Sequence, residues 1–490
     1  MDMKWFEEME ARIPKGQVRT RFAPSPTGYM HVGNLRTALY TYLTAKKENG
    51  VFILRIEDTD QSRLVEDATA IIYKTLSDCG LKHDEGPDVG GPVGPYIQTE
   101  RRELYGKYAK LLVEKGGAYR CFCRKTEGEG ENEGFKKEKC PCSYLSAEEA
   151  DAKDAVGEAS VIRQRVPLEG TTTFHDEIFG DITVPNDTLD DNVLMKSDGL
   201  PTYNFANVID DHLMGITHVV RGSEYLASSP KYNLLYESFG WTVPKYVHCS
   251  PVMRDAQNKM SKRHGDPSYE DLISEGYLTQ AVVNYVALLG WSPGGEQEVF
   301  SLDELAEAFE LSGISKSPAI FDIEKLTYFN AEYIKALAPE DFLKVAEGYI
   351  RQSVKSPAMD LLSIAKLLQP RTEKLTDIPE KIDFFDAIPD YEVDLFTNKK
   401  SKTDSVVSLA MLNAALPVLE QIGEWTNEII HDAFISLAEK LEVKNATLMW
   451  PVRISIAGKM VTPGGAVELC QILGKDETIR RIRLGIEKLS

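Results

Sequence analysis

The chain has 490 residues, of which 42% are hydrophobic and 27% charged; these are the proportions of a soluble globular protein, and the length predicts two to four domains. A formal charge of −20 argues against broad, nonspecific nucleic-acid binding, although a local basic patch can still act on an acidic surface. No apolar run approaches membrane-spanning length, and seven cysteines are an intracellular count, so we expect a cytoplasmic protein without a disulfide scaffold.

The first predicted elements alternate between helix and strand. Residues 1–16 (MDMKWFEEMEARIPKG) are acidic and lack a continuous apolar stretch, which predicts a short amphipathic helix rather than a signal peptide. QVRTRF (17–22) and VFILRIED (51–58) are typical of strands, and the helices predicted at 34–50 and 64–80 each end at a glycine. This alternation with short connections predicts a parallel α/β sheet.

An insertion follows a further helix predicted at 101–117. The segment 121–146 is polar, interrupted by glycines and bracketed by cysteines, which indicates an inserted subdomain. Strand-like runs follow it at 160–168 (SVIRQRVPL) and 171–178 (TTTFHDEI).

The strand-and-helix alternation then resumes before the chain becomes helical. THVVRG (217–222) and KYVHCSPVMRD (245–255) are strand candidates on either side of a helix. After about residue 265 the apolar residues recur with the 3.6-residue period of amphipathic helices, for example at 341–354 and 406–423. The sequence therefore predicts an α/β half with an insertion and an all-helical half.

One motif lies between the first strand and its helix. APSPTGYMHVG (23–33) is a bend that brings His31 and Gly33 to the start of the helix, where free N–H groups and the helix dipole favour a phosphate. His31 could donate a hydrogen bond to a phosphoryl oxygen as charge develops in a transition state. The alternative is a proline-rich turn whose histidine has only a structural role.

A second motif lies some 230 residues downstream. RDAQNKMSKRHGD (254–266) puts Lys259, Lys262 and Arg263 on a polar loop beside a strand candidate. Such a loop can fold over a triphosphate and neutralise a departing pyrophosphate, although a charge run can also be a solvated face. Both motifs lie at strand-to-loop transitions of the same α/β half, which predicts one nucleotide site.

PSPTGYMHVGN and KMSKR resemble the two signature motifs of class I aminoacyl-tRNA synthetases. The longer strings TRFAPSPTG, RIEDTD, DEGPDVGGPVGPY, SDGLPTYNFANVIDDHLMG and ITHVVRGSEYL resemble bacterial glutamyl-tRNA synthetases, and the similarity runs from about Val18 to the C-terminus. The resemblance implies a Rossmann-type catalytic domain, an acceptor-stem insertion, a helical stem-contact linker domain and an all-helical anticodon-binding region of two subdomains. We place these parts at 1–115 and 196–265 (catalytic), 116–195 (insertion), 266–330 (linker domain) and 331–490 (anticodon-binding).

The resemblance also implies a two-step reaction. L-Glutamate and ATP, with Mg²⁺, would give glutamyl-adenylate and pyrophosphate, and the glutamyl group would then pass to the 3′-terminal adenosine of tRNA(Glu); we expect a monomer. By resemblance, His31, Lys259 and Lys262 are catalytic. The implied ATP-binding residues are Pro24, Gly33, Asn34, Lys259, Ser261 and Lys262. Asn34 departs from the class-wide motif, which has a second histidine there, but an amide can still donate a hydrogen bond.

Selection of glutamate requires cations for a side-chain carboxylate, and a guanidinium fork matches that geometry better than lysine does. The resemblance assigns the γ-carboxylate to Arg21 and Arg221 and makes Glu57 available for the α-amino group. The full implied glutamate-binding set is Arg21, Ala23, Ser25, Glu57, Tyr203, Asn207 and Arg221. Alternatively, the arginines are surface residues near sheet edges, Glu57 caps a helix, and Tyr203 and Asn207 serve packing and structural hydrogen bonding.

Four of the seven cysteines form a cluster. Cys121, Cys123, Cys140 and Cys142 give two Cys-x-Cys pairs, and four thiolates favour a tetrahedral zinc ion of structural role. The resembling family often has Cys-x-His as the second pair, whereas this chain has Cys142-Ser-Tyr144, so we predict Cys140 as the fourth ligand and Tyr144 as the alternative. Four reduced thiols without metal are the other interpretation.

Two arginines of the helical half match anticodon-contacting positions of the family. Arg371 lies where arginine reads the last anticodon base and where non-discriminating relatives often have glutamine; Arg453 matches a second contact. An arginine can pair bidentately with an exposed base edge of a single-stranded loop. Each could instead be a helix-surface arginine without a partner.

Four other functions compete with a glutamate–tRNA ligase that discriminates against tRNA(Gln). A glutaminyl-tRNA synthetase would carry β-barrels after about residue 330, and a truncated glutamyl-queuosine-type transferase would end soon after KMSKR. A non-discriminating enzyme would also charge tRNA(Gln). From another class, a non-catalytic tRNA-binding paralogue would show no ATP–pyrophosphate exchange.

Overall fold

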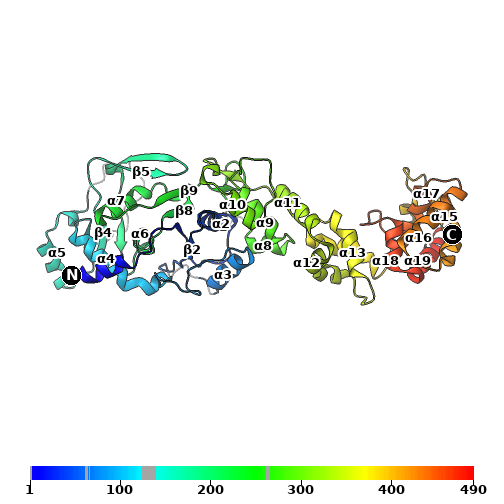
Figure 1. Cartoon of the computed structure of the whole chain (residues 1–490), viewed down its shortest axis with the longest axis horizontal. Helices are drawn as coiled ribbons and strands as arrows, with labels where there is room; N and C mark the ends of the chain where they lie inside the picture. Colours follow the sequence, from blue (N-terminus) through cyan, green and yellow to red (C-terminus); the bar gives the residue numbers. More distant parts are fainter. Residues whose placement is uncertain (1–2, 61–64, 66, 124–138, 261–264) are drawn as a thin grey trace. The chain divides into compact units, whose positions relative to one another are not determined.

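The computed structural model describes residues 3–60, 65, 67–123, 139–260 and 265–490. The chain divides into two compact units (Figure 1). The first unit comprises Met1–Leu272 and Val282–Asp322, and the second comprises Ile273–Ala281 and Ile323–Ser490.

A six-stranded sheet in the order β2-β1-β8-β9-β5-β6 forms the centre of the first unit. Its strands are parallel except β6, which forms an antiparallel hairpin with β5. In register, Arg21 lies beside Ile53, and Arg221 beside His248. The strands are β1 (Arg19–Phe22), β2 (Val51–Leu54), β5 (Thr171–Asp176), β6 (Gly180–Pro185), β8 (His218–Gly222) and β9 (Lys245–Cys249).

The strands β1, β2, β8 and β9 are almost wholly buried, as expected for parallel strands whose two faces are covered. Helix α2 packs against β1, β2 and β8. The helices of the first unit are α1 (Met3–Ala11), α2 (Val32–Lys47), α3 (Ala68–Asp78), α4 (Arg102–Glu114), α5 (Ala147–Ala155), α6 (Tyr203–Leu213), α7 (Ser229–Phe239) and α10 (Leu302–Ala308). A short parallel pair, β10 (Val252–Met253) and β11 (Ala319–Ile320), completes this unit.

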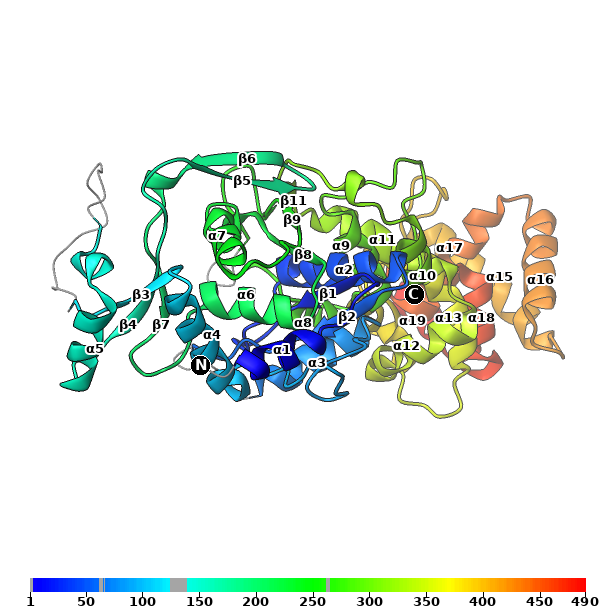
Figure 2. The same ribbon diagram turned by 60° about the vertical axis from the view of Figure 1, so that its left-hand side comes forward.

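The insertion builds a separate three-stranded antiparallel sheet, β3-β4-β7, which lies beside α5 (Figure 2). These strands are β3 (Ala118–Cys121), β4 (Val161–Gln164) and β7 (Val193–Met195). The strand predicted at 171–178 does form, as β5, but it joins the main sheet, where Asp176 pairs with Tyr246 of β9. The segment placed in the insertion at 116–195 therefore also contributes two strands to the catalytic sheet.

The second unit is helical (Figure 1), and its helices enclose a large apolar core. Its amphipathic helices bury residues such as Phe342, Leu412 and Phe434. The helices are α11 (Ile323–Ala336), α12 (Pro339–Ser353), α13 (Leu361–Leu368), α14 (Ile378–Ile382), α15 (Ser405–Gln421), α16 (Asn427–Lys440), α17 (Asn445–Ala457), α18 (Ala466–Leu473) and α19 (Lys475–Leu489). Two further helices, α8 (Tyr269–Ser274) and α9 (Thr279–Leu288), cross the boundaries of the two units.

The predicted fold class, a parallel α/β half with an insertion followed by an all-helical half, is confirmed. Across the described residues, every helix is too short or too polar to span a bilayer.

Candidate active site

A cavity of about 330 Å³ lies at the carboxyl ends of β1, β8 and β9. In open parallel sheets, ligands bind at this edge where the strand connections change direction, here between β1 and β8. The cavity wall includes most of the side chains predicted for ATP and glutamate. These are Arg21, Ala23, Pro24, Ser25, His31, Gly33, Asn34, Glu57, Tyr203, Arg221 and Lys259.

The other predicted residues are placed differently. Asn207 is buried one turn beyond Tyr203 in α6, and its amide nitrogen donates to the Tyr203 carbonyl at 2.6 Å. Asn207 is not among the described residues that line the cavity wall. Ser261 and Lys262 lie outside the described residues.

His31 occupies the N-cap of α2. Its Nδ1 accepts the backbone N–H of Gly33 at 3.0 Å, so the neutral imidazole carries its proton on Nε2. A Cβ atom at position 33 would lie 3.2 Å from His31 Nδ1, which explains the glycine at this close approach. The bend predicted from APSPTG thus presents a histidine N–H donor in the cavity at a helix N-terminus.

Arg21 is held by a carboxylate beneath the cavity. Its Nε donates to Asp211 Oδ1 at 2.9 Å, and the same oxygen accepts from Arg55 Nη1 at 2.8 Å. Because all three side chains are buried, these charged hydrogen bonds fix the orientation of the Arg21 guanidinium. Opposite charge from both arginines outweighs burial and lowers the pKa of Asp211, so this carboxylate stays ionised.

Arg221 is also buried but differs from Arg21 in its partners. Its Nε donates to His248 Nε2 at 3.0 Å and its Nη2 donates to Ser229 Oγ at 2.9 Å, and both acceptors are neutral. The rings of Tyr225, Tyr232 and Tyr246 surround it, with their centroids 4.9 to 5.3 Å from Cζ. Among the described residues no carboxylate forms an ion pair with Arg221. A buried cation without an anion is costly, so this position favours an anionic ligand.

Glu57 lies on the same wall. Burial raises the pKa of Glu57 to about 7, although Arg55 and Arg21 act in the opposite direction. The Arg55 guanidinium lies 3.4 Å from Glu57 Oε1. A ligand ammonium beside this carboxylate would favour its ionised form.

Lys259 lies at the rim of the cavity. Its side chain is more than half exposed, and its ammonium lies 3.7 Å from Glu224, which also lines the wall. An exposed pair of this kind is weak, so a polyphosphate can compete for the lysine.

The buried groups that orient the predicted residues were not predicted from the sequence. Asp211 and Arg55 fix Arg21, while His248 and Ser229 fix Arg221, and Asp176 in turn accepts from His248. The adjacent aspartates in NVIDDH were a detectable signal, since acidic residues in a buried helix require partners. No local pattern marked Asp176, His248 or Ser229.

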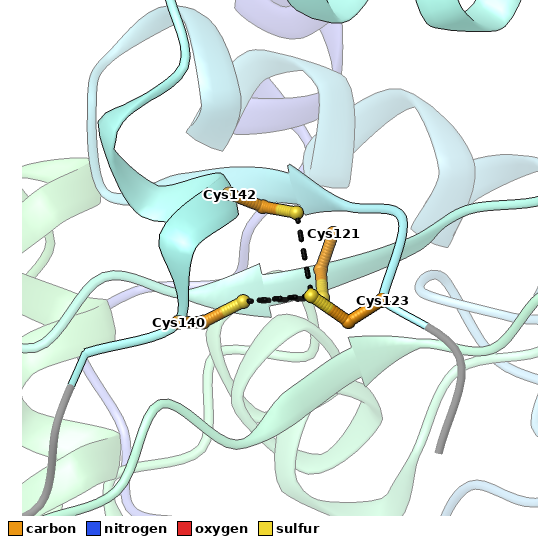
Figure 3. A group of neighbouring side chains, drawn as sticks. All are labelled: Cys121, Cys123, Cys140 and Cys142. Carbon is orange, nitrogen blue, oxygen red and sulfur yellow. Dashed lines mark hydrogen bonds between the residues drawn. The ribbon is translucent and has the colours of Figure 1, made fainter. Parts of the chain in front are cut away.

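The four cysteines predicted as zinc ligands come together in the insertion. Figure 3 shows Cys121 and Cys123 at the end of β3 facing Cys140 and Cys142 at the start of the short helix η3 (Pro141–Tyr144). The Sγ atom of Cys123 lies 3.6 Å from the Sγ atoms of Cys140 and of Cys142, and all four Sγ atoms lie within 4.8 Å of one another. Tetrahedral coordination at about 2.3 Å per zinc–sulfur bond requires similar separations, so the donors fit zinc.

The alternative ligand, Tyr144, is 71% exposed. Hydrogen bonds to Cys140 and Cys142 raise the pKa of the Cys123 thiol to about 12, so a metal ion that binds the four sulfurs has to displace the Cys123 proton.

Arg371 and Arg453 both form hydrogen bonds with the loop 460–463 of the second unit. Arg371 Nη1 donates to the Pro463 carbonyl, and Arg453 donates to Thr462 Oγ1 at 2.7 Å and to the Met460 carbonyl at 2.9 Å. Arg453 also lies over the ring of Trp450, with Cζ 4.5 Å from the centroid. Both guanidinium groups are therefore held mainly by main-chain oxygens beside an exposed loop.

Comparisons with known families agree with the two-part organisation. Residues 17–328 match the catalytic domain of class I tRNA synthetases for E and Q, the one-letter codes of glutamate and glutamine. Residues 331–486 match an anticodon binding domain.

Individual relatives match almost the whole chain. The glutamate–tRNA ligase of Clostridium tetani is 57% identical over 482 residues, which cover 96% of this chain and 98% of that protein. That of Clostridium acetobutylicum is 56% identical over 480 residues, covering 96% and 99%. The crystal structure of a glutamate tRNA ligase from Elizabethkingia meningosepticum, in complex with its amino acid, matches with a TM-score of 0.89 at 34% identity, covering 97% of this chain and 100% of that one.

Proposed function

The chain belongs to the class I tRNA synthetases for glutamate and glutamine, and within them to the glutamate–tRNA ligases, and from this premise we propose how its cavity divides the reaction among individual residues. In the first step an oxygen of the glutamate α-carboxylate attacks the α-phosphorus of ATP, and the bond to pyrophosphate breaks. In the second step a ribose hydroxyl of the 3′-terminal adenosine of tRNA(Glu) attacks the glutamyl carbonyl carbon, loses its proton, and AMP leaves.

His31 acts on the α-phosphate. Its Nε2–H donates to a phosphoryl oxygen, and this hydrogen bond strengthens as negative charge builds in the transition state. Pro24, Gly33 and Asn34 meet the nucleotide at the N-terminus of α2, which favours phosphate. Lys259, together with Ser261 and Lys262, closes over the β- and γ-phosphates of ATP, which enters with Mg²⁺ as its counter-ion.

Arg221 and Arg21 hold the γ-carboxylate of glutamate, and Glu57 holds its α-ammonium. Tyr203 packs beside the substrate, as its ring lies 5.1 Å from that of Tyr225 in the same wall. Ala23 and Ser25 border the same space. For Asn207, whose amide bonds to the Tyr203 carbonyl, we propose an indirect contribution through that turn.

One observation carries this assignment: a buried arginine whose hydrogen-bond partners among the described residues are neutral lines the same cavity as a helix-capping histidine. The test is glutamate-dependent ATP–pyrophosphate exchange, measured with and without tRNA(Glu). Exchange in the presence of tRNA(Glu), in its absence, or in both supports a catalytic role for the cavity. A non-catalytic tRNA-binding paralogue shows none under either condition.

For the tRNA, we propose that Arg371 and Arg453 contact the anticodon and that Arg371 favours tRNA(Glu) over tRNA(Gln). Their guanidinium groups flank one exposed loop, which supports a shared surface for single-stranded bases. Charging purified tRNA(Glu) and tRNA(Gln) side by side separates a discriminating enzyme from one that charges both.

We also propose that Cys121, Cys123, Cys140 and Cys142 bind a structural zinc ion in the acceptor-stem insertion. Four protein ligands leave no open position, so the metal stabilises the insertion rather than entering the reaction. Metal analysis of the purified protein should give close to one zinc ion per chain, and a Cys123→Ser variant should retain less. We expect the enzyme to work in the cytoplasm.

A further inference from the structure

A buried chain of hydrogen bonds runs away from the cavity behind Arg221. Arg221 Nε donates to His248 Nε2 at 3.0 Å, and His248 Nδ1 lies 2.6 Å from Asp176 Oδ2. His248 and Asp176 are fully buried and Arg221 nearly so. The three residues come from the ends of β8, β9 and β5, so the pairing of these strands sets their separation.

The protonation state of the His248 imidazole follows from the donors around it. A guanidinium nitrogen can only donate, so His248 Nε2 must accept, and the single proton of the neutral imidazole lies on Nδ1. That proton is donated to Asp176. A doubly protonated imidazole would place an N–H against the Arg221 Nε–H, and burial together with the charge of Arg221 lowers the pKa of His248, so the neutral form is favoured.

Backbone N–H groups fix Asp176 in addition to the His248 imidazole. Its Oδ1 accepts the backbone N–H groups of Ile178 at 2.9 Å and Phe179 at 2.8 Å, and its Oδ2 also accepts the backbone N–H of His248 at 3.1 Å. Four hydrogen bonds to one carboxylate leave it little freedom to rotate. A fixed Asp176 holds one tautomer and one ring orientation of His248, and this ring holds the guanidinium plane of Arg221.

The hydrogen bonds of Arg221 to His248 and Ser229 leave one edge of its guanidinium group available to a ligand. Nε is engaged by His248, and one hydrogen of Nη2 by Ser229, whose own hydroxyl lies 2.9 Å from the Tyr225 carbonyl. The other guanidinium hydrogens of the cavity-lining side can therefore pair with a carboxylate. A carboxylate offers two acceptor oxygens to such a fork, whereas the side-chain amide of glutamine offers one acceptor and two donors.

We propose that His248 and Asp176 are positioning residues for amino-acid selection: they hold Arg221 in the orientation that accepts the γ-carboxylate of glutamate and disfavours the γ-amide of glutamine. This inference rests on the proposed role of Arg221 as the carboxylate clamp. An Arg221 without His248 would keep its charge but lose its fixed plane. The cost would fall on glutamate binding and not on ATP binding.

Two substitutions of the same histidine separate the contacts. In His248→Gln the side-chain carbonyl can reach the position of Nε2 and accept from Arg221, whereas in His248→Asn the shorter amide can replace Nδ1 and keeps only the contact with Asp176. In aminoacylation of tRNA(Glu), we expect His248→Asn to raise the KM for glutamate about tenfold to hundredfold. The KM for ATP should stay within about twofold. The preference for glutamate over glutamine should fall, and His248→Gln should recover most of both losses.

A second variant keeps the test decisive should His248→Asn fail to fold. In Asp176→Asn, Oδ1 can keep the backbone N–H groups of Ile178 and Phe179, which turns the amide N–H2 towards His248 Nδ1 and favours the tautomer with its proton on Nε2, facing Arg221. We expect the same selective rise in the KM for glutamate. In the unaltered protein, ¹⁵N NMR of labelled histidine should show His248 as the neutral Nδ1–H tautomer at pH 7; the Nε2–H tautomer would overturn the inference.

A matched control is His83→Gln, which removes another histidine–aspartate pair, with Asp88 at 2.7 Å, away from the cavity, and should leave both KM values unchanged. If the KM values for glutamate and ATP rise together, or if His248→Gln and His248→Asn behave alike, the pair is merely structural and the inference is wrong. If Arg221→Ala itself leaves the KM for glutamate unchanged, the clamp assignment fails; if only the His248 and Asp176 variants are silent, the clamp stands and the positioning role fails.

Discussion

The two units use arginine in opposite ways. In the first unit Arg21 and Arg221 are buried, and side chains fix their guanidinium planes: Asp211 for one, His248 and Ser229 for the other. In the second unit Arg371 and Arg453 lie beside an exposed loop and bond mainly to its main-chain oxygens.

The difference matches what each pair has to recognise. A γ-carboxylate is small and must be told from an amide of the same shape, which requires a desolvated cation of fixed orientation. A nucleotide base is large, arrives from solvent and offers several edge atoms, so an accessible arginine suffices. We therefore expect substitutions of the buried arginines of the first unit to have large effects and those of Arg371 and Arg453, which are exposed and half-buried, to have small ones.

The largest effect is expected for Arg221→Ala. Removing the guanidinium takes away the main partner of the γ-carboxylate, and losing one member of a buried charge pair costs about 3–5 kcal/mol, or roughly 10²–10⁴ in affinity. The KM for glutamate should rise by that factor in tRNA(Glu) charging, while that for ATP changes little. An equal rise for both substrates would mean that the clamp is misassigned.

A somewhat smaller effect is expected for His31→Ala. Loss of a single donor to a developing charge typically lowers kcat about 10²-fold or more. The variant should bind glutamate with a nearly unchanged KM, because the clamp residues are intact. Single-turnover formation of glutamyl-adenylate in the presence of tRNA(Glu) is the measurement, and an unaltered rate would remove His31 from the chemistry.

A third prediction concerns the pH dependence of kcat/KM for glutamate, which should follow the ionisation of the buried Glu57. Burial raises the pKa of Glu57 to about 7, so this carboxylate takes up a proton as the pH falls through neutrality. A protonated Glu57 cannot hold the α-ammonium, and kcat/KM for glutamate should fall about fivefold between pH 7 and pH 6. Glu57→Gln should be poor at every pH and should lose this slope; a parent profile that is flat from pH 6 to 8 would speak against the role.

The smallest effect is expected for Arg371→Gln. The KM for glutamate should not change, and charging of tRNA(Gln) relative to tRNA(Glu) should rise about tenfold, since one bidentate base contact discriminates by about 1–3 kcal/mol. Arg483→Gln is a suitable control, because Arg483 is an exposed arginine of the same unit paired with Glu420. Similar ratios for both variants would leave Arg371 without a role in discrimination.

The parts of the fold that could be predicted were those that local sequence patterns specify. The period of apolar residues predicted β1, α2, β2 and the helical half, and the spacing of the cysteines predicted a cluster whose sulfurs do meet. The strand at 171–178 was predicted as a strand, but not as a member of the main sheet. That membership depends on pairing with β9, about 70 residues away, and no local period encodes such a contact.

The site shows the same limit. His31, Arg21 and Arg221 were found because they belong to motifs, and the structure brings all three to one cavity. Their supports were not found: Asp211 lies 190 residues from Arg21, and His248 lies 27 residues from Arg221. A sequence motif identifies a residue that can contact a ligand. The orientation of that side chain depends on partners distant in sequence, which only the fold brings together.

The most direct test of the central claim, that one cavity joins the phosphate donor to the carboxylate clamp, is a crystal structure with a non-hydrolysable glutamyl-adenylate analogue. We predict that its γ-carboxylate lies within hydrogen-bond distance of Arg221 and Arg21, with the phosphate mimic beside His31 Nε2. A γ-carboxylate bound away from both arginines, or a phosphate mimic outside the reach of His31, would contradict the account.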